Sequence, residues 1–203
     1  EAPGSCCYMI GKVIVPVLIT GISSSNKEIQ DLCLNAFTDY INTFDYVLIK
    51  ENESVITGKE NIIKKVVSYI ESDDLSLQTN AINFIGTFSL LLNKKQIQLA
   101  LDSILHLFKK AKDNKDRIAY FNALNSIAKT SATKQLDYVK VIFPLISQYS
   151  KKSFLENDAG DYDEKNDLAE SALNLLETYI LKLNTSVSGD CKEIVVNNLE
   201  LIE

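Results

Sequence analysis

The chain has 203 residues, 46% of them hydrophobic, with only 7 Gly and 3 Pro and a net charge of −6. So few turn-forming residues argue against an all-β sandwich or barrel, and the hydrophobic fraction is sufficient for a sizeable core. Because the chain is acidic and its only arginine is Arg117, nucleic acid is not an expected partner.

The N-terminal segment 1–9 is expected to be disordered or added ahead of the natural sequence, and 10–203 to form a single domain. Neither end carries a clear start or stop signal, which predicts a piece of a longer protein. No CxxC or CxxH spacing occurs among the four cysteines, Cys6, Cys7, Cys33 and Cys191. We therefore expect reduced thiols in an intracellular protein, cytoplasmic or nuclear. No apolar run reaches the length of a transmembrane helix.

Amphipathic segments follow one another in pairs along the chain. The first helix of each pair is expected within 9–22, 58–72, 94–112 and 136–150. Asp or Asn in the turns that follow supplies N-caps for the second helices, at 23–28, 72–74 and 112–116. Thr57 and Glu60 are spaced as a capping box for the second of these first helices. Pro16 and Pro144 predict kinks inside first helices. A fifth first helix, 189–203, has no partner.

Each second helix contains an alanine that serves as an anchor: Ala36, Ala81, Ala123 and Ala172. The spacings between them are 45, 42 and 49 residues, close to the period of HEAT repeats, which are paired helices of roughly 40–47 residues. Apolar residues recur four before, one after and four after each alanine, and so share one side of a helix. The sequence predicts an all-α fold, a HEAT/armadillo-type α-solenoid of about four and a half helical hairpins with a right-handed superhelix.

Polar residues flank each anchor alanine on the other side of the helix. They form a predicted ridge of eight residues: Asn35, Thr38, Asn80, Asn83, Asn122, Asn125, Ser171 and Asn174. Second helices usually line the concave side of a solenoid, so we expect this ridge to contact a partner. Two other interpretations remain open, an exposed uncharged face duplicated with the repeats, and amides that bond to the adjacent turn.

The turn at 151–165 is longer than the others and strongly acidic. Its carboxylates are Glu156, Asp158, Asp161, Asp163 and Glu164. A segment of this composition is not expected to pack. It is interpreted either as a solvated insertion or as a docking loop for a basic partner.

Catalytic and metal-binding patterns are missing from the sequence. The single histidine, His106, borders the apolar stripe of a first helix, and we interpret it as structural. The pair Asp73 and Asp74 fits a polar turn and an N-cap better than a catalytic dyad. No glycine-rich phosphate loop occurs. We therefore expect no enzyme activity, no cofactor and no bound metal.

The repeats resemble a known family. The likeness is carried by LISQYSK (145–151), DLAESALNLLETYILKL (167–183) and CKEIVVNNLELIE (191–203), and the layout of 62–88 is similar. Over roughly residues 10–203 the chain resembles the N-terminal HEAT array of the cullin-associated, neddylation-dissociated proteins. The matched segments contain no catalytic motif to carry over, so no site residue is transferred from that family.

The resemblance implies a helical scaffold that binds an unneddylated cullin–RING complex and promotes the exchange of substrate receptors on the ubiquitin ligase. Two alternatives remain open. One is an importin-β-type nuclear transport receptor, which uses similar hairpins and binds Ran and basic cargo. The other is a generic HEAT scaffold subunit. In each case we expect protein partners, no nucleic acid, no membrane and a monomer.

Overall fold

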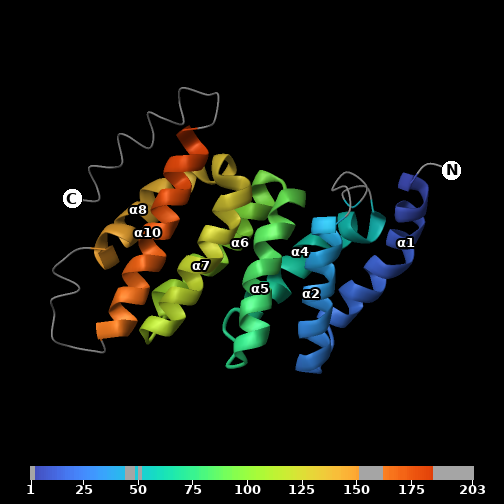
Figure 1. Cartoon of the computed structure of the whole chain (residues 1–203), viewed down its shortest axis with the longest axis horizontal. Helices are drawn as coiled ribbons and strands as arrows, with labels where there is room; N and C mark the ends of the chain where they lie inside the picture. The colour runs from blue at the N-terminus through green and yellow to red at the C-terminus, as the bar shows by residue number, and fades with distance from the viewer. Residues whose placement is uncertain (1–2, 44–48, 50–51, 151–161, 185–203) are drawn as a thin grey trace. The chain divides into compact units, whose positions relative to one another are not determined.

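The computed structural model contains helices and no strand among the residues that it describes, which are 3–43, 49, 52–150 and 162–184 (Figure 1). The predicted all-α class is therefore confirmed. The chain divides into two compact units, 1–103 and 104–203, and the boundary falls inside a helix. The continuous right-handed solenoid over 10–203 stays a prediction.

The first unit contains two stacked pairs of helices (Figure 1). Its elements are α1 (Pro3–Ile22), α2 (Lys27–Thr43), α4 (Glu53–Tyr69), α5 (Leu75–Phe88), the 3₁₀ helix η1 (Ser89–Leu91) and the first part of α6 (Lys94–Lys110). Helix α1 packs against α2, and α4 packs against α5. The pairs stack because α1 contacts α4 and α2 contacts α5. First helix thus lies on first helix and second on second, as the repeat pattern predicts for neighbouring hairpins.

An aromatic cluster joins the two second helices of the first unit. The ring of Phe37 on α2 lies 5.4 Å from that of Phe84 and 6.0 Å from that of Phe88, both on α5. Phe84 and Phe88 stack at 5.0 Å. All three side chains are fully buried. Large aromatic side chains dominate the energetics of such cores, so this cluster stabilises the contact between α2 and α5.

The second unit is organised around α10. Its elements are the rest of α6, then α7 (Asn114–Ser131), the 3₁₀ helix η2 (Ala132–Tyr138), α8 (Val139–Ser150) and α10 (Tyr162–Asn184). Helix α10 packs against both α7 and α8, and η2 contacts all three. Aromatic contacts again fill the core, with Phe108 and Phe121 at 4.9 Å and Phe143 and Tyr179 at 5.8 Å.

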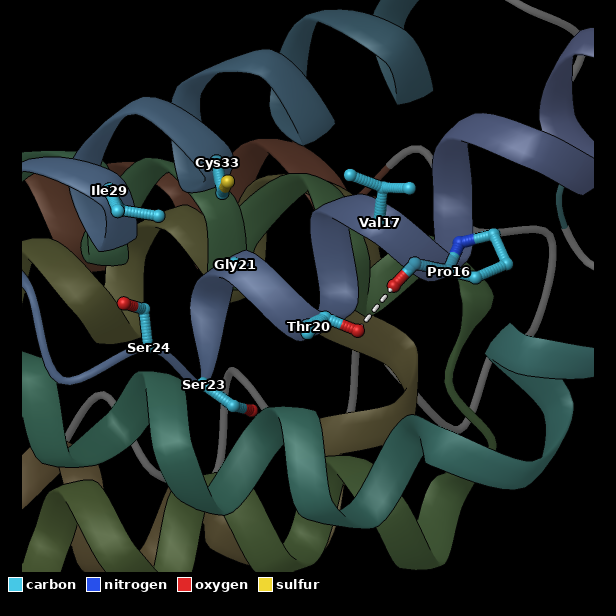
Figure 2. A pocket seen from close by; sticks show the side chains of 8 residues that line it. All are labelled: Pro16, Val17, Thr20, Gly21, Ser23, Ser24, Ile29 and Cys33. Carbon is cyan, nitrogen blue, oxygen red and sulfur yellow. Dashed lines mark hydrogen bonds between the residues drawn. The ribbon is translucent and has the colours of Figure 1, made fainter.

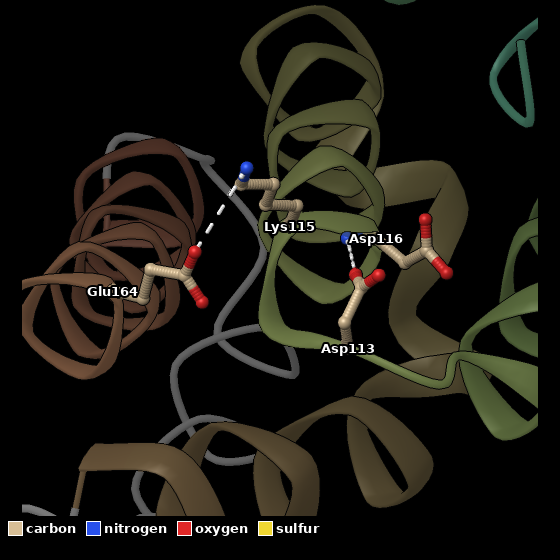
Figure 3. Close-up of polar contacts among 4 residues, drawn as sticks. All are labelled: Asp113, Lys115, Asp116 and Glu164. Carbon is tan, nitrogen blue, oxygen red and sulfur yellow. Dashed lines mark hydrogen bonds and ion pairs between the residues drawn. The ribbon is translucent and has the colours of Figure 1, made fainter. Parts of the chain in front are cut away.

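Side-chain N-caps begin the second helices where the turns predicted them. Asp74 Oδ1 accepts a hydrogen bond from Ser76 N at 3.0 Å, and Asp113 Oδ1 accepts from Asp116 N at 2.9 Å (Figure 3). Asn26 Oδ1 accepts at 2.8 Å from the backbone N–H two residues later. Each bond satisfies a donor that the helix itself leaves unpaired.

The start of α4 differs from the prediction. Asn52 is the N-cap, with its Oδ1 accepting from Ser54 N at 3.1 Å, and Thr57 lies inside the helix. The capping box proposed for Thr57 is therefore wrong. The Asn52 amide also donates to the carbonyl of Gly11 on α1 at 3.1 Å. This bond links residues that are distant in the sequence, which explains why the local pattern did not reveal it.

Two other boundaries lie earlier than expected. Helix α1 begins at Pro3, so residues 3–9, predicted as disordered, are helical. Proline has no backbone N–H, and it suits this position because the N–H groups in the first turn of a helix have no acceptor within the helix. Helix α10 begins at Tyr162, which places the end of the predicted loop 151–165 in a helix. The kink-forming prolines lie inside α1 and α8 as predicted.

The anchor alanines confirm the register in three of the four second helices. Ala81, Ala123 and Ala172 are 0% exposed, whereas Ala36 is exposed. A buried alanine allows a neighbouring helix to approach closely, and α2 packs on α5 in this way. The opposite side of α2, where Ala36 lies, has no such neighbour among the described residues.

Candidate protein-binding surfaces

The eight residues of the predicted ridge do not share one environment. Four amide side chains reach solvent, one on each second helix: Asn35, Asn83, Asn122 and Asn174. Thr38 and Asn80 are half-buried, and Asn125 and Ser171 are buried. An accessible row of eight residues is therefore wrong, and the candidate contact residues reduce to two amides in each unit.

Within the first unit, the half-buried ridge residues bond to their own protein. Asn80 Nδ2 on α5 donates to Asp31 Oδ1 on α2 at 2.8 Å, and Ser76 Oγ donates to the other oxygen of that carboxylate at 2.8 Å. Thr38 Oγ1 donates to the carbonyl of Leu34 one turn earlier, also at 2.8 Å. The interpretation that ridge amides bond within their own protein thus applies to Asn80. Its partner is not the adjacent turn but a carboxylate on α2, the second helix of the preceding hairpin.

Within the second unit, burial removes two ridge residues from contact with any partner. Asn125 on α7 is 9% exposed and Ser171 on α10 is 8% exposed. The two helices pack directly against each other. Asn125 Oδ1 has no hydrogen-bond partner within the described part of the chain. A buried acceptor without a partner is unfavourable, so this asparagine contributes less to stability than an apolar residue of its size would.

The predicted acidic docking loop is described only at its end. Glu156, Asp158 and Asp161 lie outside the described residues. Asp163 and Glu164 belong to the first turn of α10, where carboxylates favour the positive end of the helix dipole. Figure 3 shows Glu164 facing α7, with its Oε1 4.0 Å from Lys115 Nζ. Both side chains are accessible to solvent, so this ion pair contributes little to stability.

The described residues contain no group of three His, Cys, Asp or Glu side chains that could hold a metal ion. His106, which borders the apolar stripe of α6, is exposed. Asp74 is confirmed as an N-cap. Within the described ranges, no helix has both the length and the apolar character needed to cross a bilayer.

A hollow on the outer side of α1 and α2 was not predicted (Figure 2). Its volume is about 700 Å³, and its lining comes from both helices and the turn between them: Pro16, Val17, Thr20, Gly21, Ser23, Ser24, Ile29 and Cys33. Thr20 Oγ1 donates to the carbonyl of Pro16 at 2.9 Å. A Cβ atom at Gly21 would overlap Cys33 Sγ, so this glycine permits the close approach of the two helices. Partial burial raises the pKa of the Cys33 thiol.

Buried polar contacts elsewhere are structural, because solvent cannot reach them. The Tyr179 hydroxyl donates to Gln135 Oε1, linking α10 to η2. Both side chains are 0% exposed, and burial raises the pKa of Tyr179. Lys59 Nζ donates to the carbonyl of Leu91 at 2.7 Å and so ties α4 to the end of η1. These residues position the helices and are not available to a partner.

Comparisons with known proteins do not add a family. No family model matches the chain, and no curated protein matches it. The crystal structure of an engineered protein is similar over 99% of this chain and 84% of its own length, with 17% identity and a TM-score of 0.49. A second engineered protein is similar over 92% of this chain and 47% of its own, with 17% identity and a TM-score of 0.44. Similarities of this strength carry no functional conclusion.

Proposed function

We propose that the chain is a non-catalytic, protein-binding scaffold built from HEAT/armadillo-type hairpins. One observation supports this proposal above the others. Every second helix presents a solvent-exposed amide on the polar side of its anchor alanine. The amide stands one residue before the alanine for Asn35 and Asn122, and two residues after it for Asn83 and Asn174. The alanine itself is buried in three of the four helices. The repeat therefore preserves a surface feature together with a packing feature. Polar side chains that recur on the same side of neighbouring second helices are typical of the binding surface of a helical array.

Amide side chains suit this role chemically. Each presents two N–H donors and one carbonyl acceptor, and can therefore pair with the backbone or the polar side chains of a partner. An uncharged amide also costs less to desolvate than a carboxylate or an ammonium group. Asn35 and Asn83 belong to the first unit, and Asn122 and Asn174 to the second. Each unit then offers its own pair of contact residues.

The favoured partner is an unneddylated cullin–RING complex, as the family resemblance implies. The test is binding of the purified chain to immobilised cullin–RING complex in the unmodified and the neddylated form. Binding to the unmodified form alone is the expected result. Binding to neither form, or to both equally, would remove the cullin from the proposal while leaving a scaffold with another partner.

A variant pair tests the amide surface itself. Asn35→Ala together with Asn83→Ala is expected to weaken partner binding by about 1–3 kcal/mol, because the hydrogen-bond partners on the bound protein lose their pairs. Stability should not fall, since alanine is the better helix former. The matched control is Asn61→Ala, an exposed asparagine on α4 outside the ridge. Equal binding by the double variant and this control would show that the exposed amides are not contact residues.

A nuclear transport receptor is the second candidate, and the net charge of −6 favours it because such receptors carry basic cargo. The same binding assay with Ran in its GTP form and with a basic cargo peptide separates the two. Binding of Ran would favour transport over ligase regulation.

A further inference from the structure

The outer side of the first hairpin carries a group of exposed apolar side chains, which adjoins Asn35 of the amide surface on α2. We call it the first-hairpin face and define it by Val13 and Val17 on α1 with Ile29, Leu32 and Ala36 on α2. Val17 is 65% exposed and Leu32 is 69% exposed. The hollow of about 700 Å³ opens on the same side, between the two helices (Figure 2). Two members of the face, Val17 and Ile29, line this hollow. Exposed apolar side chains gathered at a hollow mark an interaction site more often than isolated ones do.

The equivalent positions of the next repeat indicate which kind of structural element can pack on this face. Leu32 and Ala36 stand at the same positions relative to the repeat as Leu77 and Ala81 on α5. Leu77 and Ala81 are buried, and the helix that packs on α5 from the preceding hairpin is α2. The first-hairpin face therefore has the form of a surface that accepts an α-helix laid along α2.

The charge at its edge shows which helix fits. Glu28 and Asp39 are exposed and lie at about −80° and −60° from Ala36 around α2, so they border the face on one side. Neither has an ion-pair partner among the described residues. The neighbouring lysine, Lys27, lies about 180° from Ala36 and points away from the face. The border provided by α2 is thus acidic, which favours a partner with positive charge.

We propose that the first-hairpin face binds an amphipathic α-helix of another protein, with an apolar stripe along the groove and Lys or Arg along one edge. The apolar stripe covers Val17 and Leu32, and one large side chain enters the hollow beside Cys33. The basic edge lies along Glu28 and Asp39. This mode of recognition, a helix in a groove, uses anchors spaced at three and four residues. The proposal does not depend on the identity of the cullin partner, and its test uses no substitution of the amide surface.

The experiment uses a synthetic helix of about five turns, with leucines on one face and lysines beside them, and a matched peptide with glutamates in place of the lysines. Fluorescence anisotropy should show binding of the basic peptide to the full chain and much weaker binding of the acidic one. Leu32→Ser should weaken binding of the basic peptide about tenfold or more through lost apolar burial. Glu28→Gln with Asp39→Asn should weaken it about threefold to tenfold.

The matched control is Glu170→Gln with Glu177→Gln, which removes two exposed carboxylates from α10. It should leave binding unchanged. An equal loss in both double variants would mean non-specific attraction and would overturn the proposal, as would equal binding of the two peptides. Circular dichroism confirms folding, which is expected because all five positions are exposed.

The thiol beside the hollow gives an independent readout. In a Cys6→Ser, Cys7→Ser, Cys191→Ser background, the basic peptide should slow alkylation of Cys33, and an unchanged rate would place the peptide elsewhere.

Two other occupants of the face can be distinguished from a partner helix. If sedimentation velocity shows a dimer and Leu32→Ser dissociates it, the face binds a second copy of this chain. Binding that requires deletion of 185–203 would assign it to the chain's own C-terminal segment. Either result contradicts the proposal.

Discussion

The second helices of the two units use the same motif in opposite ways. Asn-Ala-x-Asn occurs in α5 and in α7, and the alanine is fully buried in both. The second asparagine is exposed in α5, as Asn83, but buried in α7, as Asn125. A helix position sets the direction in which a side chain leaves the helix, whereas neighbouring helices determine whether that direction leads to solvent.

The cores of the two units also differ in how their polar groups are paired. In the first unit, the α2–α5 contact combines a phenylalanine cluster with a carboxylate network in which Asp31 is intermediate in exposure. In the second unit, polar groups are enclosed, including Asn125 Oδ1 and Gln135 Nε2, which have no partner within the described ranges. The polar groups at the α2–α5 contact are therefore paired, whereas the enclosed groups of the second unit lower its stability where they lack a partner.

The largest expected effect compares two residues at the same repeat position, Phe37 on α2 and Leu173 on α10. Phe37 is 0% exposed and Leu173 is 48% exposed. Phe37→Ala should lower the free energy of unfolding by about 3–5 kcal/mol through lost burial and the cavity that remains. Leu173→Ala should lower it by less than about 1 kcal/mol. Urea unfolding measures both, and equal losses would mean that Leu173 is covered in solution.

The anchor alanines give the next comparison. Ala81→Leu inserts three carbon atoms into a fully buried site and should cost about 1–3 kcal/mol. Ala36→Leu places the same atoms on an exposed surface and should change stability by no more than about 0.5 kcal/mol. Thermal unfolding followed by circular dichroism distinguishes them. A large loss for Ala36→Leu would contradict the exposed position of this alanine.

The buried hydroxyl in the second unit predicts a loss of similar or smaller size. Tyr179→Phe should cost about 1–3 kcal/mol, because Gln135 Oε1 loses its donor in a site without solvent. Tyr69→Phe is the counterpart in the first unit, where the hydroxyl donates to the backbone carbonyl of Ile22. We expect the smaller loss there, because Tyr69 is 7% exposed and Tyr179 is 0% exposed. Chemical denaturation at neutral pH tests the order.

The same tyrosine predicts a dependence on alkaline pH. Burial raises the pKa of Tyr179 above the value of about 10 that it has when unfolded. The folded state therefore favours the neutral phenol. The stability that this phenol contributes is complete below pH 10 and is lost as the pH rises towards the folded pKa. Above pH 10, the wild type should lose about 1.4 kcal/mol per pH unit relative to Tyr179→Phe. The urea unfolding midpoints of the wild type and of Tyr179→Phe, measured at pH 8 and pH 11, test this prediction. Equal losses of stability in the two proteins would refute it.

The smallest effect concerns the two asparagines of the shared motif. Asn125→Ala removes a buried acceptor without a partner and adds helix propensity, so stability should stay equal or rise by up to about 1 kcal/mol. Asn83→Ala should raise it by a few tenths of a kcal/mol through propensity alone. A clear loss for Asn125→Ala in thermal unfolding would show that an ordered water pairs with its Oδ1.

Local features of the sequence were sufficient for the helical class, the turns and the register. Asn26, Asp74 and Asp113 cap helices because their short side chains reach backbone donors a few residues away. The alanine spacing identified three buried anchor positions, since burial follows the helical period wherever a neighbour is present.

Tertiary structure alone decided the cap at Asn52, the burial of Asn125 and Ser171, and the exposure of Ala36. Asn52 is held by the carbonyl of Gly11, 41 residues earlier in the chain. The repeat pattern assigns Ala36 and Ala81 the same position, yet only Ala81 is covered by another helix. A periodic sequence specifies which way each side chain points, but which helix lies opposite depends on contacts between distant segments, and these leave no local signal.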